Sequence, residues 1–131
     1  MERREKERMI EKYVEAYNTF DVEGMMNLLH PDVLFCNLFR ERITVATRGK
    51  TEFRSLAEHG ATLFRSRKQE VLSLRDIPSG MVASIHYKAE LAADLPNGMK
   101  VGECMDFKGT SEFMFKDGLL CSITYSSGEE A

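Results

Sequence analysis

Two segments at opposite ends of the chain constrain its fold more than any other feature. Residues 13–37 predict a helix, a break at Asp21, a second helix and then a strand that opens at Asp32. Residues 111–125 predict a strand, a turn at residues 116–118 and a closing strand. A chain that combines amphipathic helices with β-hairpins must bury the apolar face of its helices against a sheet.

The apolar spacing between these segments extends the pattern over the whole chain. Helices are predicted where apolar residues recur every three or four positions, over residues 3–18, after Asp21 and after Gly49. Strands are predicted over 33–39, 69–77, 81–91, 101–115 and 119–125, with a further short strand between 40 and 48. Turn sequences join the last four strands, so the chain is predicted to be α+β with an antiparallel sheet.

The predicted sheet leaves room for a cavity. Gly102 and Gly109 are expected bend or bulge points in the long strand over 101–115. A bent antiparallel sheet must cover one face with helices, and three helices of this size are too few to fill a strongly curved sheet. We therefore expect an internal cavity, which is the usual place for a ligand.

The length, composition and net charge limit the number of domains and the classes of partner that are expected. A length of 131 residues predicts one domain spanning 1–131, and a hydrophobic share of 43% is enough for a sizeable core. The formal net charge is −3, which argues against nucleic-acid and anionic-membrane partners, since phosphate binding needs concentrated Lys and Arg. The mixed run over residues 2–8 is interpreted as a solvated helical turn.

The three cysteines indicate a reducing compartment. Cys36, Cys104 and Cys121 form no C-x-x-C pair, and all three lie in apolar strand patterns, so we expect buried free thiols. No set of side chains has metal-ligand spacing, so we expect no metal and no cofactor. No apolar run is long enough to span a membrane, and the charged N-terminus is unlike a signal peptide, so a cytoplasmic location is expected.

Three short motifs carry a resemblance to a known family. They are E-K-Y-V-E-A-Y-N-T-F-D at 11–21, D-V-L-F-C-N at 32–37 and F-M-F at 113–115. The chain resembles the nuclear transport factor 2-like superfamily, which includes the ketosteroid isomerases and SnoaL-like cyclases. The resemblance implies a cone-shaped, curved antiparallel or mixed sheet wrapped around three helices. It also implies a homodimer formed through the sheet face, with His86 as an interface candidate.

The resemblance assigns candidate site residues by position. Tyr13 matches the tyrosine that donates to the substrate oxyanion in the isomerases. Asn37 matches their aspartate base, and Ser111 matches the protonated acid that donates a second hydrogen bond. An amide cannot accept the proton, so isomerase activity by that mechanism is not expected.

Other acids could replace the missing base. If Ser111 faces inward and the strand keeps its period of two, Glu103 faces inward as well. A bulge at Gly109 would present Asp106 instead. A carboxyl group buried among Met and Phe would have a raised pKa, as a general base needs. The alternative, which the rarity of unpaired buried carboxylates favours, is that both acids are solvated.

Aromatic residues and a methionine are predicted to line or fill the cone. As core side chains they need no ligand, whereas as pocket walls they imply a flat, apolar small molecule. This set consists of Tyr17, Phe35, Phe39, Phe64, Met105, Phe107 and Phe113.

The expected function is that of a small-molecule pocket protein. If it is an enzyme, we expect cofactor-free isomerisation, dehydration or ring closure of an apolar carbonyl compound. Tyr13 and Ser111 would polarise the oxygen, and Asp106 or Glu103 would move the proton. The alternatives are a ligand-binding module without catalysis, which Asn37 supports, and a dimerisation or interaction domain of the same fold.

Overall fold

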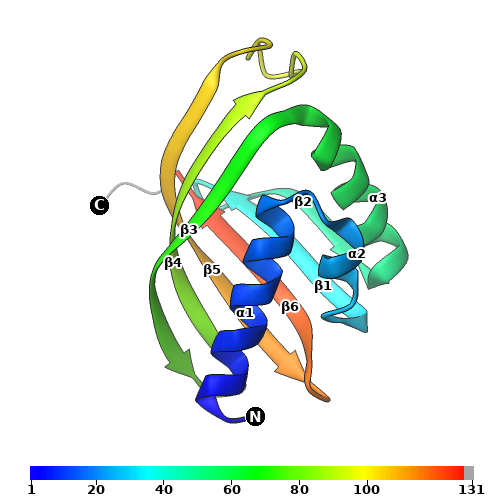
Figure 1. The fold of residues 1–131 in the computed structure, drawn as a ribbon, viewed down its shortest axis with the longest axis vertical. Helices are drawn as coiled ribbons and strands as arrows, with labels where there is room; N and C mark the ends of the chain where they lie inside the picture. Colours follow the sequence, from blue (N-terminus) through cyan, green and yellow to red (C-terminus); the bar gives the residue numbers. More distant parts are fainter. Residues whose placement is uncertain (129–131) are drawn as a thin grey trace.

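A computed structural model describes residues 1–128 as one curved, six-stranded sheet with three helices on its concave side (Figure 1). The helices are α1 (Arg3–Asn18), α2 (Val22–Met26) and α3 (Gly49–Leu63). The strands are β1 (Leu29–Phe39), β2 (Arg42–Arg48), β3 (Phe64–Ile77), β4 (Gly80–Leu91), β5 (Cys104–Lys116) and β6 (Leu119–Ser127). The predicted α+β class with a curved, mixed sheet is confirmed.

The strand order is β2-β1-β6-β5-β4-β3. Strands β3 to β6 form an antiparallel meander, as the four predicted hairpin-connected strands require. Strand β1 pairs in parallel with β6 and antiparallel with β2, which forms one edge of the sheet. We call the end at which α1 begins the base, and the end that carries the β4–β5 connection the mouth (Figure 1).

The first two helices follow from their apolar spacing and capping. Ile10, Tyr13 and Val14 are buried on the face that α1 turns toward the sheet. Asp21 caps α2, because its side chain accepts a hydrogen bond of 2.9 Å from the backbone nitrogen of Gly24. The helix ends at Met26, earlier than predicted.

Strand β1 begins earlier than predicted, and it includes Pro31. Its pairing with β6 shifts register between Leu29 and Leu34. The residues between these two positions are therefore not regularly paired with β6. A proline without an N–H is tolerated at such an interruption. Strand β3 is also longer than predicted, since it begins at Phe64 directly after α3.

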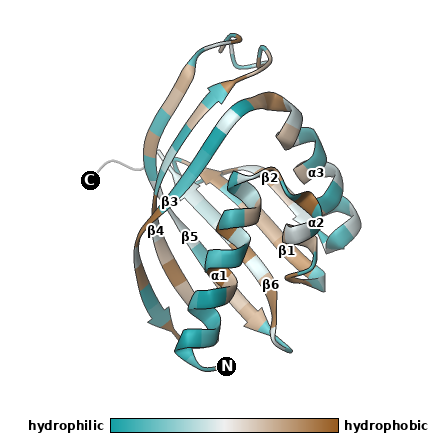
Figure 2. Ribbon diagram, in the orientation of Figure 1, coloured by the Kyte–Doolittle hydropathy of each residue, from teal (hydrophilic) through white to brown (hydrophobic). Residues whose placement is uncertain are grey.

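The core lies between α1, α2 and the concave face of the sheet. The largest fully buried side chains are Phe113, Ile10, Leu29, Met81, Ile85, Leu91, Leu120 and Val33. Along β4, buried positions alternate with half-buried or exposed ones from Met81 to Leu91, as predicted. Figure 2 shows hydrophobic and hydrophilic bands along the strands of the sheet.

At the base, Lys6 fastens α1 to the β3–β4 turn. Its ammonium group donates to Asp76 Oδ1 at 2.9 Å, to the carbonyl oxygen of Gly80 at 3.3 Å and to that of Ile77 at 3.4 Å. Although Lys6 is only 7% exposed, all three of its donors therefore have acceptors.

The cysteines are less buried than predicted. Cys104 is exposed at the start of β5, and Cys36 and Cys121 are half-buried. Cys36 and Cys104 pair across strands with Ala46 and Glu90 on the convex face, so they lie outside the core. Within residues 1–128, no helix is long and apolar enough to cross a membrane.

The backbone of β6 and the Tyr125 side chain lie unusually close to Gly109. The strand does not bulge there, although a glycine would allow a bulge. The pairing of β4 with β5 runs through Gly109 with no shift. A Cβ atom at this position would lie 2.5 Å from the carbonyl oxygen of Ser126 and 2.8 Å from Tyr125 Oη. The missing side chain therefore lets the Tyr125 side chain lie across β5.

We predict that Gly109→Ala destabilises the protein, because the added methyl group meets backbone that cannot move away cheaply. The expected loss of unfolding free energy is about 1–3 kcal/mol, measured by urea denaturation. Gly60→Ala in α3 is the matched control, since a Cβ there lies 4.0 Å from its nearest neighbour, Arg67 Nη1 of β3. The control should gain about 0.5–1 kcal/mol. Equal stability of the two variants would contradict the close approach at Gly109.

Candidate functional site

The cross-strand register determines which side chains face the helices. Ser111 of β5 lies opposite the buried Ala83 of β4 and opposite Tyr125 of β6. Tyr125 in turn lies beside Asn37 of β1. Because directly paired residues share a face, these side chains belong to the concave face.

Three phenol groups gather on this face, and we call Tyr17, Tyr87 and Tyr125 the tyrosine cluster. They come from α1, β4 and β6. The hydroxyl oxygens of Tyr17 and Tyr87 are 2.8 Å apart and share a hydrogen bond. Tyr125 Oη is buried, lies over Gly109 and has no hydrogen-bond partner. Buried polar atoms without a partner are rare in folded proteins, so this hydroxyl needs an explanation.

Two polar residues of β3 flank the tyrosine cluster. The Arg67 guanidinium lies 3.7 Å from the Tyr17 ring centroid and 4.5 Å from that of Phe20, and its Nε donates to the Tyr17 carbonyl oxygen at 2.8 Å. Gln69, which pairs with Tyr87 across the strands, has a buried Oε1 atom without a partner. Three buried side-chain oxygens on the concave face lack partners among the described residues. They are those of Tyr125, Gln69 and Thr47, and Thr47 lies on β2 opposite Phe35, away from the tyrosine cluster.

Aromatic rings form the mouth side of the cluster. Phe107 stacks on Tyr87 with a centroid distance of 5.1 Å, and Phe64 meets Tyr87 edge-on at 6.4 Å. Phe107 and the neighbouring Met105 are half-buried, so this wall borders solvent. Its flat surfaces suit contact with a planar molecule.

Burial keeps the tyrosines neutral. Loss of solvation raises the pKa of Tyr125 to about 12, and it also raises the pKa values of Tyr13, Tyr17 and Tyr87. The positive charge of Arg67 opposes this rise at Tyr13, Tyr17 and Tyr87. At neutral pH these groups are therefore hydrogen-bond donors and cannot act as bases.

Tyr13, Ser111 and Asn37, the residues assigned by the resemblance, each lie in surroundings different from those of the other two. Tyr13 is buried one turn closer to the base than Tyr17, with its ring 5.9 Å from that of Phe113 in an edge-on contact. Ser111 is buried on the same strand as Phe113. The amide of Asn37 donates to Thr44 Oγ1 at 2.8 Å, so it is used within the β1–β2 hairpin.

The acids proposed as bases do not face the interior. Asp106 is on the convex face, where its Oδ1 lies 2.6 Å from His86 Nε2, and this contact lowers the pKa of Asp106. Because Gly109 causes no bulge, the two faces of the strand are not exchanged, and the inward Asp106 that a bulge would give is wrong. Glu103 precedes β5 in an exposed loop, where it accepts from the backbone nitrogen of Lys100. An inward Glu103 is wrong as well, because the strand begins only at Cys104. The favoured alternative, in which both acids are solvated, is confirmed, since both are exposed.

The remaining predicted lining residues are divided between core and rim. Phe113 is fully buried, and Phe35 packs 5.6 Å from Phe53 of α3. Phe39 is 47% exposed at the end of β1. Tyr17, Phe64, Met105 and Phe107 are the predicted lining residues that lie at or beside the tyrosine cluster.

The sequence analysis missed Tyr87, Tyr125, Arg67 and Gln69 as site residues. Tyr87 lies on the alternating apolar face of β4, and Tyr125 follows Ile123 at a spacing of two, so strand periodicity could have indicated both. Arg67 precedes the segment predicted as β3, and it carried no such signal.

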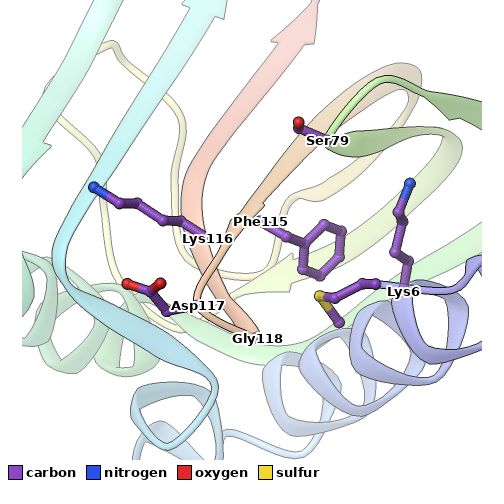
Figure 3. Close-up of a pocket in the computed structure, with 7 residues that line it drawn as sticks. Lys6, Ser79, Phe115, Lys116, Asp117 and Gly118 are labelled. Atoms are coloured by element: carbon purple, nitrogen blue, oxygen red, sulfur yellow. The ribbon is translucent and has the colours of Figure 1, made fainter.

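Two cavities of about 300 Å³ lie away from the centre of the cluster. The first is at the base, lined by Met1, Lys6, Ser79, Phe115, Lys116, Asp117 and Gly118 (Figure 3). All three N–H groups of the Lys6 ammonium there already donate to protein oxygens. The second is a groove along the mouth ends of β3, β4 and β5, and most of its lining, including Lys88, Glu90 and Asp106, belongs to the convex face. It also touches Arg67, which flanks the tyrosine cluster from the other side of the sheet.

Comparison with solved structures identifies the fold. A candidate hydroxylase, AclR from Streptomyces galilaeus, is 17% identical with a TM-score of 0.77, over 96% of this chain and 90% of its own. A candidate polyketide cyclase from Xanthomonas campestris is 18% identical with a TM-score of 0.80, over 95% and 90%. A protein with a ketosteroid isomerase-like fold from Catenulispora acidiphila, solved with trimethylamine, is 7% identical with a TM-score of 0.73, over 89% and 82%.

An NTF2-like protein from Burkholderia pseudomallei is 14% identical with a TM-score of 0.74, over 92% and 88%. These similarities show the nuclear transport factor 2-like fold. The model of the SnoaL-like domain family matches residues 10–123, and the chain belongs to that family. The predicted family resemblance is therefore confirmed. A search of curated protein sequences gave no significant match. The homodimer and the cytoplasmic location stay predictions.

We predict that none of the four tyrosines ionises near pH 10 while the protein is folded. Because the pKa values are raised in the folded state, the unfolded chain loses its phenol protons first, from about pH 10. The tyrosines therefore stabilise the fold below that pH, and the unfolding free energy falls as the pH rises toward 12, the pKa of Tyr125. Tyrosinate absorbance and circular dichroism should change together in an alkaline titration. A phenol that titrates near pH 10 without loss of structure would contradict the burial of the tyrosines.

Proposed function

We propose that this protein binds a small, flat organic molecule whose carbonyl or phenol oxygen pairs with the tyrosine cluster. The observation that carries the proposal is the buried Tyr125 hydroxyl, which has no partner among residues 1–128. Leaving such a group unpaired costs about 1–3 kcal/mol, which a ligand that accepts its proton would recover.

The chemistry of the neighbouring groups narrows the ligand. Gln69 Oε1 is the second buried oxygen without a partner beside the cluster, and an amide oxygen can only accept. A ligand that satisfies both groups carries an acceptor for Tyr125 and a donor for Gln69. Hydroxylated aromatic carbonyl compounds have both, and their flat rings suit the wall formed by Phe64, Tyr87 and Phe107. That wall supports a polyketide-like ligand, the compound class named for one protein of similar fold.

Ligand entry requires side chains to move, because Tyr125 Oη is out of contact with solvent. Phe107 and Met105 are the half-buried side chains on the mouth side of the cluster. Rotation of these two side chains would open a path without disturbing the core residues Phe113 and Ile85, which are fully buried.

Binding is better supported than catalysis by a resident base. The two candidate acids lie outside the concave face, and the amide of Asn37 is bonded to Thr44. A second candidate function is ring closure of a 1,3-dicarbonyl compound, which is acidic enough to lose its methylene proton to water. The electron pair would move to the carbonyl oxygen, where the Tyr125 hydroxyl would stabilise the enolate. The enolate carbon would then attack a second carbonyl carbon of the same molecule, which forms the ring bond, and the alkoxide left on that carbonyl would take a proton from water. The hydrogen-bonded pair of Tyr17 and Tyr87 beside Tyr125 favours this candidate.

We predict that Tyr125→Phe weakens the binding of 2-naphthol about tenfold, which corresponds to one hydrogen bond of about 1.4 kcal/mol. Binding of naphthalene, which lacks the oxygen, should stay within twofold. Fluorescence titration of both compounds measures this difference. Thr124→Val is the matched control, because Thr124 is adjacent in β6 but faces the convex side.

The same titration on Tyr13→Phe separates the structural assignment from the one implied by the family resemblance. Loss of the 2-naphthol preference in Tyr13→Phe alone would move the donor to Tyr13 and contradict the role of Tyr125. Equal affinity of the wild-type protein for 2-naphthol and naphthalene would overturn the proposed function.

A further inference from the structure

Arg67 is a buried cation beside the tyrosine cluster. Its residue is 6% exposed, and no salt bridge within residues 1–128 involves it. Arginine stays charged at every ordinary pH, so burial cannot neutralise it. A buried charge is costly unless an opposite charge or several hydrogen bonds compensate it.

The partners of Arg67 in the structure are all neutral. The carbonyl oxygen of Tyr17, in the last turn of α1, accepts from Nε, where the helix dipole also favours a cation. The rings of Tyr17 and Phe20 stack on the guanidinium. These contacts hold the guanidinium in place, but they supply no formal negative charge.

The other titratable groups that face the cluster do not balance Arg67. Tyr13 and Tyr17 on α1, Tyr87 on β4 and Tyr125 on β6 are neutral phenols. On the inner side of β3 at the base, Asp76 is paired with Lys6.

The convex face adds no free acid near Arg67. Its nearest acidic side chains, Glu90 and Asp106, are paired with Arg65 and His86. The interior around the cluster therefore carries one uncompensated positive charge among the described residues.

Arg67 lies on the concave face in the row next to the tyrosine cluster. Across the strands it pairs with Ala89, which pairs with Met105, and the next row toward the base consists of Gln69, Tyr87 and Phe107. The groove of about 300 Å³ at the mouth touches Arg67, Ala89 and Met105, but its other lining residues belong to the convex face. The guanidinium itself lies on the concave side, 3.7 Å from the centroid of the Tyr17 ring and beside the tyrosine cluster.

We propose that the site selects organic anions, and that Arg67 compensates the negative oxygen of a bound enolate, phenolate or carboxylate. The inference rests on the proposed function and adds the charge of the ligand to it. In the low-polarity interior the attraction between the two charges is stronger than in water. The anionic form of a ligand is therefore bound in preference to its neutral form.

The test uses 4-nitrophenol, whose phenol and phenolate forms absorb at different wavelengths. On binding to the wild-type protein, the pKa of the ligand should fall by at least one unit, which means that the phenolate binds at least tenfold more tightly than the phenol. In Arg67→Met the pKa of the bound ligand should return to its value in water or rise above it, whereas Arg67→Lys should keep part of the shift.

A control variant addresses the general potential of the protein surface. Lys88→Met removes a cation that lines the mouth groove on β4. It should change the ratio of phenolate affinity to phenol affinity by less than twofold. An equal loss in Lys88→Met and Arg67→Met would overturn the assignment to Arg67. Circular dichroism checks that each variant is folded. If Arg67→Met does not fold, the test rests on the pKa of 4-nitrophenol bound to the wild-type protein and to Arg67→Lys.

The possible outcomes separate this inference from the proposed function. If the wild-type protein binds phenol and phenolate equally, or prefers the phenol, the charge preference is overturned while the binding site stands. If it binds neither form, nor nitrobenzene as the analogue without a hydroxyl, both proposals fail.

Discussion

The uninterrupted pairing of β4, β5 and β6 through Gly109 is the constraint on which the site depends. It keeps every second residue of β5 on the concave face, so Phe107 and Ser111 point inward while Asp106 points outward to His86. Gly109 itself has no side chain, and the ring of Tyr125 fills the space above it. The regular register thus keeps the carboxylate of Asp106 out of the interior, and Gly109 leaves room for the phenol of Tyr125.

The interior that results is polar but almost free of charge. Its tyrosines are held neutral by burial. Of the two buried cations in the described part of the chain, Lys6 is paired with Asp76 and Arg67 has no acidic partner. Such an interior stabilises negative charge on a ligand without offering a group that removes a proton. Hydrogen-bond donors that are fixed before binding are effective because they need no reorganisation when charge develops.

Much of the fold could be predicted from the sequence, because periodicity and turn residues are local signals. The alternation along β4 and the turns between β3 and β6 were sufficient for the meander. The site depends on register and on tertiary contacts, which periodicity does not determine. Whether Gly109 forms a bulge, and whether the Asn37 amide points to Thr44 or to the interior, is decided by the neighbouring strands.

Tyr13 and the tyrosine cluster lie at different heights on the concave face. Tyr13 occupies the position that a resemblance to the isomerases assigns to the donor, but it lies toward the base and packs on Phe113. One turn along α1, Tyr17 reaches Tyr87 and Arg67, closer to the mouth. The fold can keep its helices and sheet while the polar groups move by one helical turn, because the core needs only apolar volume. The function proposed above and a function transferred by position therefore place the oxygen of the ligand at different ends of the concave face, and Tyr13→Phe and Tyr125→Phe distinguish them.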